Sequence, residues 1–127
     1  MATVLVVEDD ALLQKIYRKE LEEAGIHVHV ASSGEQALDM LAKPEAQPDV
    51  IILDIVLPGK DGYDVLEELR KLPSFTSIPV IILTNLKQKV EVERAQNLGA
   101  KEFLSKSDIK EGDLVKVVRW HVEHKTT

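Results

Sequence analysis

The sequence predicts a doubly wound α/β sandwich built on a five-stranded parallel sheet. Short apolar runs rich in β-branched residues alternate with stretches of helical periodicity along the 127 residues. Three of the runs lack polar alternation, which is typical of strands covered on both faces. The length is that of one domain, and right-handed crossovers between parallel strands place helices on both faces of the sheet.

Five short segments have the character of strands. Three are continuously apolar and are expected in the middle of the sheet. One alternates between apolar residues and histidines and suits a sheet edge, and the last is only two residues long. In chain order the segments are 4–7, the alternating 26–30, 50–53, 80–83 and 103–104.

Five helices are predicted between and after these strands. Asp10 suits the N-cap of the first helix and Gly25 its C-terminal end. Pro44, Pro73 and Gly99 follow the second, third and fourth helices, where each would stop a helix. The apolar stripes expected to face the sheet are Leu13, Ile16, Tyr17, Leu21 and Ala24; Ala37, Leu38 and Leu41; Val65, Leu66, Leu69 and Leu72; Val90, Ala95 and Leu98; and Leu114, Val117, Val118 and Val122.

Composition excludes several classes of protein. The net charge of −6 opposes direct nucleic-acid binding. With no Cys, disulfide scaffolds, thiolate metal sites and thiol nucleophiles are excluded. No apolar run approaches the roughly 20 residues of a membrane span, and the start of the chain lacks a basic signal-peptide region. We therefore expect a single cytoplasmic domain over residues 1–127, with no membrane insertion and no output domain.

Polar residues follow the apolar runs at the carboxyl ends of four strands. Glu8 and Asp9 follow the first strand, Asp54 the third, Thr84 the fourth and Lys106 the fifth. In an open parallel sheet, ligands bind beyond these strand ends. A single acid at a strand end is more often a turn residue or an N-cap. A lone Lys there is usually solvated, and a lone Thr is usually just a good strand former. The joint pattern on four strands is much stronger evidence of a site.

The chemistry of this set follows from its charges. Neighbouring carboxylates repel each other, and a hard divalent cation such as Mg²⁺ relieves that repulsion. Asp54 could then attack a phosphoryl group to form an aspartyl phosphate, a reaction catalysed chiefly by positioning and charge neutralisation. Lys106 and Thr84 suit the phosphoryl oxygens.

In these segments the sequence resembles the receiver domain of bacterial two-component response regulators. The resemblance runs from about Val4 to the last helix. It implies the flavodoxin-like (βα)5 fold with strand order 2-1-3-4-5. The matching segments are VLVVEDD (4–10), LDIVLPGKDG (53–62), VIILT (80–84) and GAKEFLSK (99–106).

The resemblance also implies a role for each site residue. Asp54 would be the phosphoacceptor. Mg²⁺, or alternatively Mn²⁺, would be bound directly by Asp9 and Asp54, through water by Glu8, and by the backbone carbonyl of Val56. Thr84 and Lys106 would contact the phosphoryl oxygens, and Phe103 would be an aromatic switch.

The implied partners are a histidine kinase or histidine phosphotransfer protein, and a downstream protein bound by the face of the fourth helix, fifth strand and fifth helix. That face could also form a homodimer. The product is a conformational signal, so the chain is not expected to be an enzyme beyond its own phosphorylation and dephosphorylation.

Two other functions compete with this interpretation. A phosphorylation-independent interaction module of the same fold would have an incomplete set of site residues, whereas here the set is complete. A magnesium-dependent phosphatase would carry an acid two residues after the nucleophile, where this chain has Val56.

Several details stay open at this level. Ser107 stands where the family usually has proline, so the bond after Lys106 could be cis or trans. Asn85 could contact the phosphoryl group or adopt an unusual backbone geometry. Trp120 could be exposed as an anchor for a partner or packed against the preceding helix. The histidine pairs 27/29 and 121/124 could bind a metal, although ordinary surface or half-buried histidines are the commoner case.

The apolar Val56 and Leu86 should exclude the hydrolytic water and slow self-dephosphorylation.

Overall fold

The computed structural model describes residues 1–43, 45 and 47–124. Five strands form one sheet in the order β2-β1-β3-β4-β5, with every neighbouring pair parallel. This confirms the predicted sheet and strand order. The strands are β1 (Thr3–Val7), β2 (His27–Ala31), β3 (Val50–Leu53), β4 (Val80–Thr84) and β5 (Glu102–Ser105).

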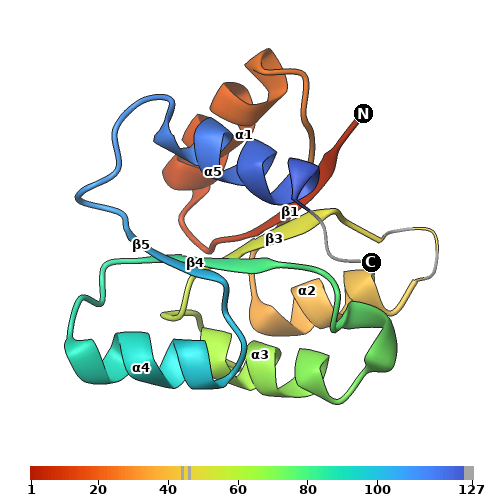
Figure 1. Cartoon of the computed structure of the whole chain (residues 1–127), viewed down its shortest axis with the longest axis vertical. Coiled ribbons are helices and arrows are strands. Elements are labelled where there is room, and N and C mark those ends of the chain that lie inside the picture. The colour runs from red at the N-terminus through yellow and green to blue at the C-terminus, as the bar shows by residue number, and fades with distance from the viewer. Residues whose placement is uncertain (44, 46, 125–127) are drawn as a thin grey trace.

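Helices cover both faces of the sheet, as a doubly wound fold requires. Figure 1 shows α1 and α5 on one face and α2, α3 and α4 on the other. A short 3-10 helix, η2 (Pro73–Phe75), follows α3. The α-helices are α1 (Ala11–Glu23), α2 (Gly34–Leu41), α3 (Gly62–Arg70), α4 (Lys89–Asn97) and α5 (Asp113–Glu123).

The core consists of two apolar layers separated by the sheet. Successive strand residues point to opposite faces, so β1 contributes Val4 and Val6 to the α1/α5 side and Leu5 and Val7 to the other. All residues of β3 and β4 are buried. This two-sided burial is why their sequences are continuously apolar.

Three residues predicted on buried helical stripes are exposed instead, so those assignments were wrong. Ile16 is 47% exposed because it borders a surface groove beside α1. Leu72 is 43% exposed because α3 already ends at Arg70, before Pro73. Val90 is 65% exposed in the first turn of α4.

The ends of the first helix follow the sequence prediction. The Asp10 side chain accepts hydrogen bonds from the backbone N–H groups of Leu12 and Leu13, as an N-cap does. Gly25 has φ +82°, the left-handed conformation that favours glycine. Strand β2 begins at His27, one residue later than predicted, and lies at the sheet edge.

Among the described residues, no helix combines the length and the apolar character that crossing a membrane requires.

Candidate metal and phosphoryl-transfer site

The side chains predicted to form a site meet at the carboxyl edge of the sheet. The sheet's backbone pairing extends to the residues that follow the strands. The N–H of Asp54 donates to the carbonyl of Val7 at 3.1 Å, and the N–H of Lys106 donates to the carbonyl of Thr84 at 2.9 Å. Asp54 and Lys106 are therefore held by the sheet itself, which fixes the direction of their side chains.

Three carboxylates come together at this edge. Each of Glu8, Asp9 and Asp54 offers one oxygen, and these oxygens lie within 4.8 Å of one another. Glu8 and Asp54 are buried, whereas Asp9 is exposed. The separation suits ligands of a single ion, and carboxylates with open positions for water or phosphate are the set that Mg²⁺ prefers.

Lys106 lies between the two buried acids. Its Nζ is 2.5 Å from Oδ2 of Asp54 and 2.6 Å from Oε1 of Glu8. Burial works to lower the pKa of Lys106, but the hydrogen bonds to the two acids and the attraction of their charges together outweigh burial, so the pKa lies above its ordinary value. The ammonium is therefore charged at neutral pH and neutralises part of the acidic cluster.

The bond between Lys106 and Ser107 is trans, since the described residues contain no cis peptide. Lys106 thus reaches both acids without the cis bond that the sequence left open. Asn85 is exposed and does not have a positive φ, which excludes a left-handed backbone there.

The position of Glu8 opposes ionisation of its carboxyl group. Burial raises the pKa of Glu8, and the hydrogen bonds from Lys106 and from the backbone N–H of Asp10 oppose that rise only in part. Two buried carboxylates thus share one nearby ammonium. This remaining negative charge is a second reason why the residues fit a divalent cation.

We expect Glu8→Gln to stabilise the metal-free protein at neutral pH, by on the order of 1 kcal/mol. A carboxyl whose pKa is raised by folding favours folding at low pH, and that contribution is lost as the pH rises through the folded pKa. The gain should shrink in more acidic buffer, where wild-type Glu8 is already protonated. Urea unfolding across a pH series measures it.

Glu67→Gln, at an exposed position of α3, is the matched control and should leave stability nearly unchanged. A Glu8→Gln variant less stable than wild type at neutral pH would mean that pairing with Lys106 outweighs the cost of burying the charge.

Thr84 and Val56 lie at the same edge of the sheet as the acids. Thr84 ends β4 and is fully buried; its Oγ1 accepts a long, 3.5 Å hydrogen bond from the N–H of Leu86. The N–H of Val56 donates to Oδ1 of Asp54 at 3.2 Å, while the Val56 side chain is 59% exposed. Phe103 lies further from the edge, half-buried against the core layer on the α3/α4 side.

The histidine pairs form no comparable site. The rings of His27 and His29 meet edge to face, with centroids 4.7 Å apart. His121 is buried, 3.4 Å from a carboxylate oxygen of Glu102, and His124 stacks on Trp120. Within the described part of the chain, the three acids at the strand ends are the only group of three or more acidic or histidine ligands within this reach.

Trp120 is 53% exposed, which confirms the exposed alternative of the two that the sequence left open.

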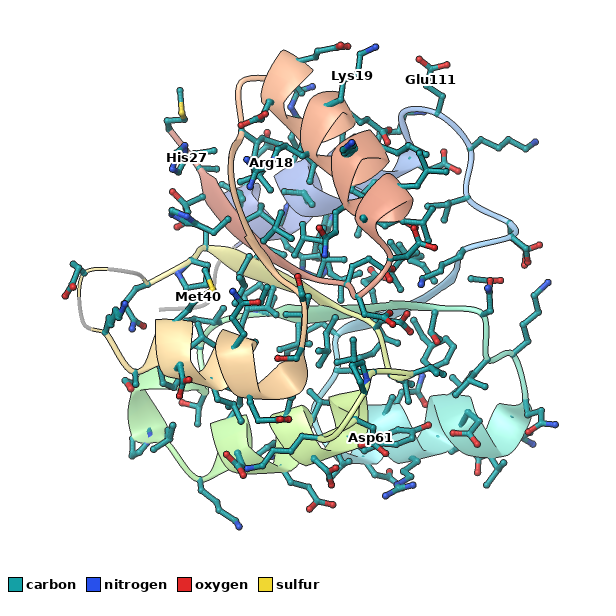
Figure 2. The ribbon with its side chains drawn as sticks, turned by 180° about the vertical axis from the view of Figure 1, so that it is seen from behind. Arg18, Lys19, His27, Met40, Asp61 and Glu111 are labelled. Atoms are coloured by element: carbon teal, nitrogen blue, oxygen red, sulfur yellow. The ribbon has the colours of Figure 1, made fainter. Side chains whose placement is uncertain are left out.

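One buried neighbour of the site, Tyr17, was not singled out as functional. Tyr17 is buried next to the site, and burial, opposed by the charge of Lys106, raises its pKa to about 12. Tyr17 and Lys106 line a groove of about 550 Å³ between α1 and the loop before α5. Lys19 of α1 borders the groove on one side and Glu111, in the loop before α5, borders it on the other (Figure 2). Tyr17 could be predicted only as part of an apolar stripe.

Comparisons with known proteins agree with this geometry. The family described as the response regulator receiver domain matches residues 4–119. The probable transcriptional regulator ycf27 of Guillardia theta is 39% identical over 81% of this chain and 39% of its own length. The probable transcriptional regulator ycf29 of Porphyra purpurea is 36% identical over 81% of the chain and 48% of its own length. The chain thus spans less than half of these curated relatives.

Solved structures give the same result. A putative response regulator from Chloroflexus aurantiacus has a TM-score of 0.88 at 30% identity, with 97% of this chain and 98% of that one covered. The activated N-terminal receiver domain of Klebsiella pneumoniae RstA has a TM-score of 0.85 at 27% identity, with 96% and 99% covered. With the family match covering nearly the whole chain and the acids meeting where the fold places them, the chain belongs to the response regulator receiver domain family.

Proposed function

We propose that the chain is a phosphorylation-controlled signalling module in which Asp54 accepts a phosphoryl group from a histidine kinase or histidine phosphotransfer protein. Phosphorylation then changes partner binding on the face formed by α4, β5 and α5. The observation that carries the proposal is that the Asp54 carboxylate meets two further carboxylates, of Glu8 and Asp9, and the ammonium of Lys106.

The residues fit a bound Mg²⁺, which would neutralise charge on the phosphoryl oxygens and on the acids. Glu8, Asp9, Asp54 and the backbone carbonyl of Val56 would hold it. The fit rests on three ligand oxygens lying within 4.8 Å of one another and on two buried acids whose charge the single ammonium of Lys106 neutralises in part.

The transfer needs few groups from the protein. A carboxylate oxygen of Asp54 attacks phosphorus as the bond from phosphorus to the donor imidazole nitrogen breaks, and that nitrogen keeps the electron pair. Lys106, already 2.5 Å from Asp54, is positioned to follow the new charge onto a phosphoryl oxygen. The Thr84 hydroxyl, at the end of the neighbouring strand, supplies a further donor.

Mass spectrometry of the intact protein tests the reaction class. Incubation with a small phosphodonor and Mg²⁺ should add one phosphoryl group, and a chelator should prevent the addition. Hydroxylamine should remove the group, because it attacks acyl phosphates but leaves phosphate esters of serine or threonine intact. A protein that gains no phosphoryl group under these conditions would be the phosphorylation-independent module instead.

The lifetime of the phosphoryl group should depend on Val56. The apolar side chain at this position offers no hydrogen bond to orient a hydrolytic water, so we expect slow self-dephosphorylation. Val56→Asn supplies an amide at the same exposed place and should speed phosphate loss, while Val56→Leu should not. Phosphate release followed over time measures the rate. An unchanged or slower rate in the Asn variant would contradict the role of Val56.

The partner on the α4-β5-α5 face could be a second copy or another protein. Sedimentation of the protein with and without beryllofluoride and Mg²⁺ separates these cases, since only self-association increases the mass in the absence of other proteins. Trp120, exposed on α5 and stacked on His124 with centroids 4.2 Å apart, would suit an aromatic anchor for either partner.

A further inference from the structure

Helix α4 is weakly anchored in the hydrophobic core. Of its residues Lys89–Asn97, all of which the structure describes, only Ala95 is buried, whereas α3 buries five residues over the same length. The N-cap residue Gln88 makes no side-chain hydrogen bond to the helix. Most helices owe their stability to packing of an apolar face, so α4 depends more than its neighbours on polar contacts.

Tyr63 of α3 supplies these contacts. The side chain is buried, with an exposed fraction of 3%. Its hydroxyl donates to the Glu91 carboxylate and is 3.1 Å from the backbone carbonyl of Glu91. The guanidinium carbon of Arg94, one turn further along α4, lies 4.0 Å from the centroid of the Tyr63 ring. One side chain therefore holds two consecutive turns of α4.

The Tyr63 hydroxyl keeps its proton. Burial and then the hydrogen bond to Glu91 raise the pKa of Tyr63 above its ordinary value. The hydroxyl therefore remains a donor to α4 at neutral pH.

The first turn of α3, which carries Tyr63, packs against the backbone of the proposed phosphoacceptor Asp54. Gly62, the preceding residue, donates its N–H to the carbonyl of Ile55 at 2.8 Å. A Cβ atom built on Gly62 would lie only 2.5 Å from the carbonyl oxygen of Asp54. The first turn of α3 thus contacts the end of β3 directly on one side and α4 through Tyr63 on the other.

We propose that Tyr63 is a latch that holds α4 in place while Asp54 is unphosphorylated, and that releasing the latch favours the phosphorylated arrangement of the α4-β5-α5 face. The first half, that Tyr63 holds α4 in place, does not depend on the proposed function. The second half, that releasing Tyr63 favours the phosphorylated arrangement, rests on it. If α4 has two arrangements, any group that contacts one arrangement better than the other shifts the equilibrium between them toward that arrangement.

Hydrogen exchange of the unphosphorylated protein tests the first half. Tyr63→Phe removes the hydroxyl but keeps the ring under Arg94, and should speed exchange of the α4 amides roughly two- to tenfold, the range expected for one lost hydrogen bond. Exchange in α1 and α2 should change less. Glu91→Gln should act in the same direction. Glu93→Gln is the control, since Glu93 is exposed and its carboxylate forms an ion pair with Lys89, at 3.7 Å, on the outer side of α4.

Unchanged α4 exchange in Tyr63→Phe, or an equal increase in α1 and α4, would overturn the latch, because the tyrosine would then be an ordinary packing residue. This arm uses no phosphate, so it is decided even if Asp54 is never phosphorylated.

Phosphorylation kinetics test the second half. With a small phosphodonor and Mg²⁺, Tyr63→Phe should gain its phosphoryl group severalfold faster than wild type, because less of the population is held in the unreactive arrangement. Glu93→Gln should react at the wild-type rate. Equal rates for wild type and Tyr63→Phe would overturn the link between the latch and Asp54. A wild-type protein that takes up no phosphoryl group would refute the proposed function, while the exchange result would still stand.

Discussion

Replacing Asp54 by Asn should abolish phosphoryl uptake. Asn has nearly the same shape, so the fold and the hydrogen bond from the N–H of Val56 can be retained. Its neutral amide oxygen, however, is a far weaker nucleophile than a carboxylate oxygen. Loss of a nucleophile typically lowers a rate by several orders of magnitude. Intact-mass measurements after treatment with phosphodonor and Mg²⁺ should therefore show the unmodified mass throughout.

Asp39→Asn provides the matched control, since Asp39 is exposed on α2, away from the strand ends. It should be phosphorylated like wild type. If the Asp54→Asn variant still gained one phosphoryl group at the wild-type rate, the acceptor would lie elsewhere. Glu8 and Asp9 would then be the first residues to test, because their oxygens lie within 4.8 Å of the ligand oxygen of Asp54.

The sheet and the site could be predicted from sequence for one physical reason. Strands buried on both faces are continuously apolar, so residues 50–53 were identified with the bounds of β3, and 80–83 came within one residue of β4. Once parallel order is assumed, the residue after each strand must lie at one edge. The convergence of Asp54 and Lys106 follows from topology without knowledge of any side-chain contact.

Helix faces were less predictable, because an apolar residue does not always face the core. Ile16 and Tyr17 are neighbours on α1 and both fit the apolar stripe, yet Tyr17 is 4% exposed and Ile16 47%. The spacing alone does not show where the stripe ends, since that depends on how far the loop before α5 covers α1. Val90 was misplaced because α4 contributes little to the core, so an apolar residue in its first turn need not face the sheet.

Polar contacts between helices leave no periodic signal. The hydroxyl of Tyr63 meets Glu91 across 28 positions of sequence. The carboxylate of Glu20 on α1 accepts a hydrogen bond from the N–H of Gly112, 92 positions away, at 2.7 Å. Such pairs depend on how neighbouring helices are placed on the sheet. They become visible only once the tertiary structure is known.

Gly62→Ala should destabilise the protein by about 3 kcal/mol, the upper part of the usual range for overpacking. A Cβ atom at this position would lie 2.5 Å from the carbonyl oxygen of Asp54 and 2.7 Å from Cα of Ile55, and both of these are backbone atoms that cannot rotate away. Either α3 or the end of β3 must shift. Urea unfolding measures the loss, and the fraction that folds should be phosphorylated more slowly, because the shift displaces Asp54 relative to Lys106.

Gly25→Ala separates this clash from ordinary glycine strain. Gly25 has φ +82°, but a Cβ there would meet nothing within 4 Å, so its cost should be only the left-handed backbone, about 1–2 kcal/mol. It should also leave phosphorylation unaffected. If Gly62→Ala lost less stability than Gly25→Ala, or kept the wild-type phosphorylation rate, the close approach of α3 to the Asp54 backbone would not constrain the site. In that case the loop after β3 would have to be positioned by other contacts, of which the hydrogen bond from the N–H of Lys60 to the Glu35 carboxylate, at 3.0 Å, is the next to test.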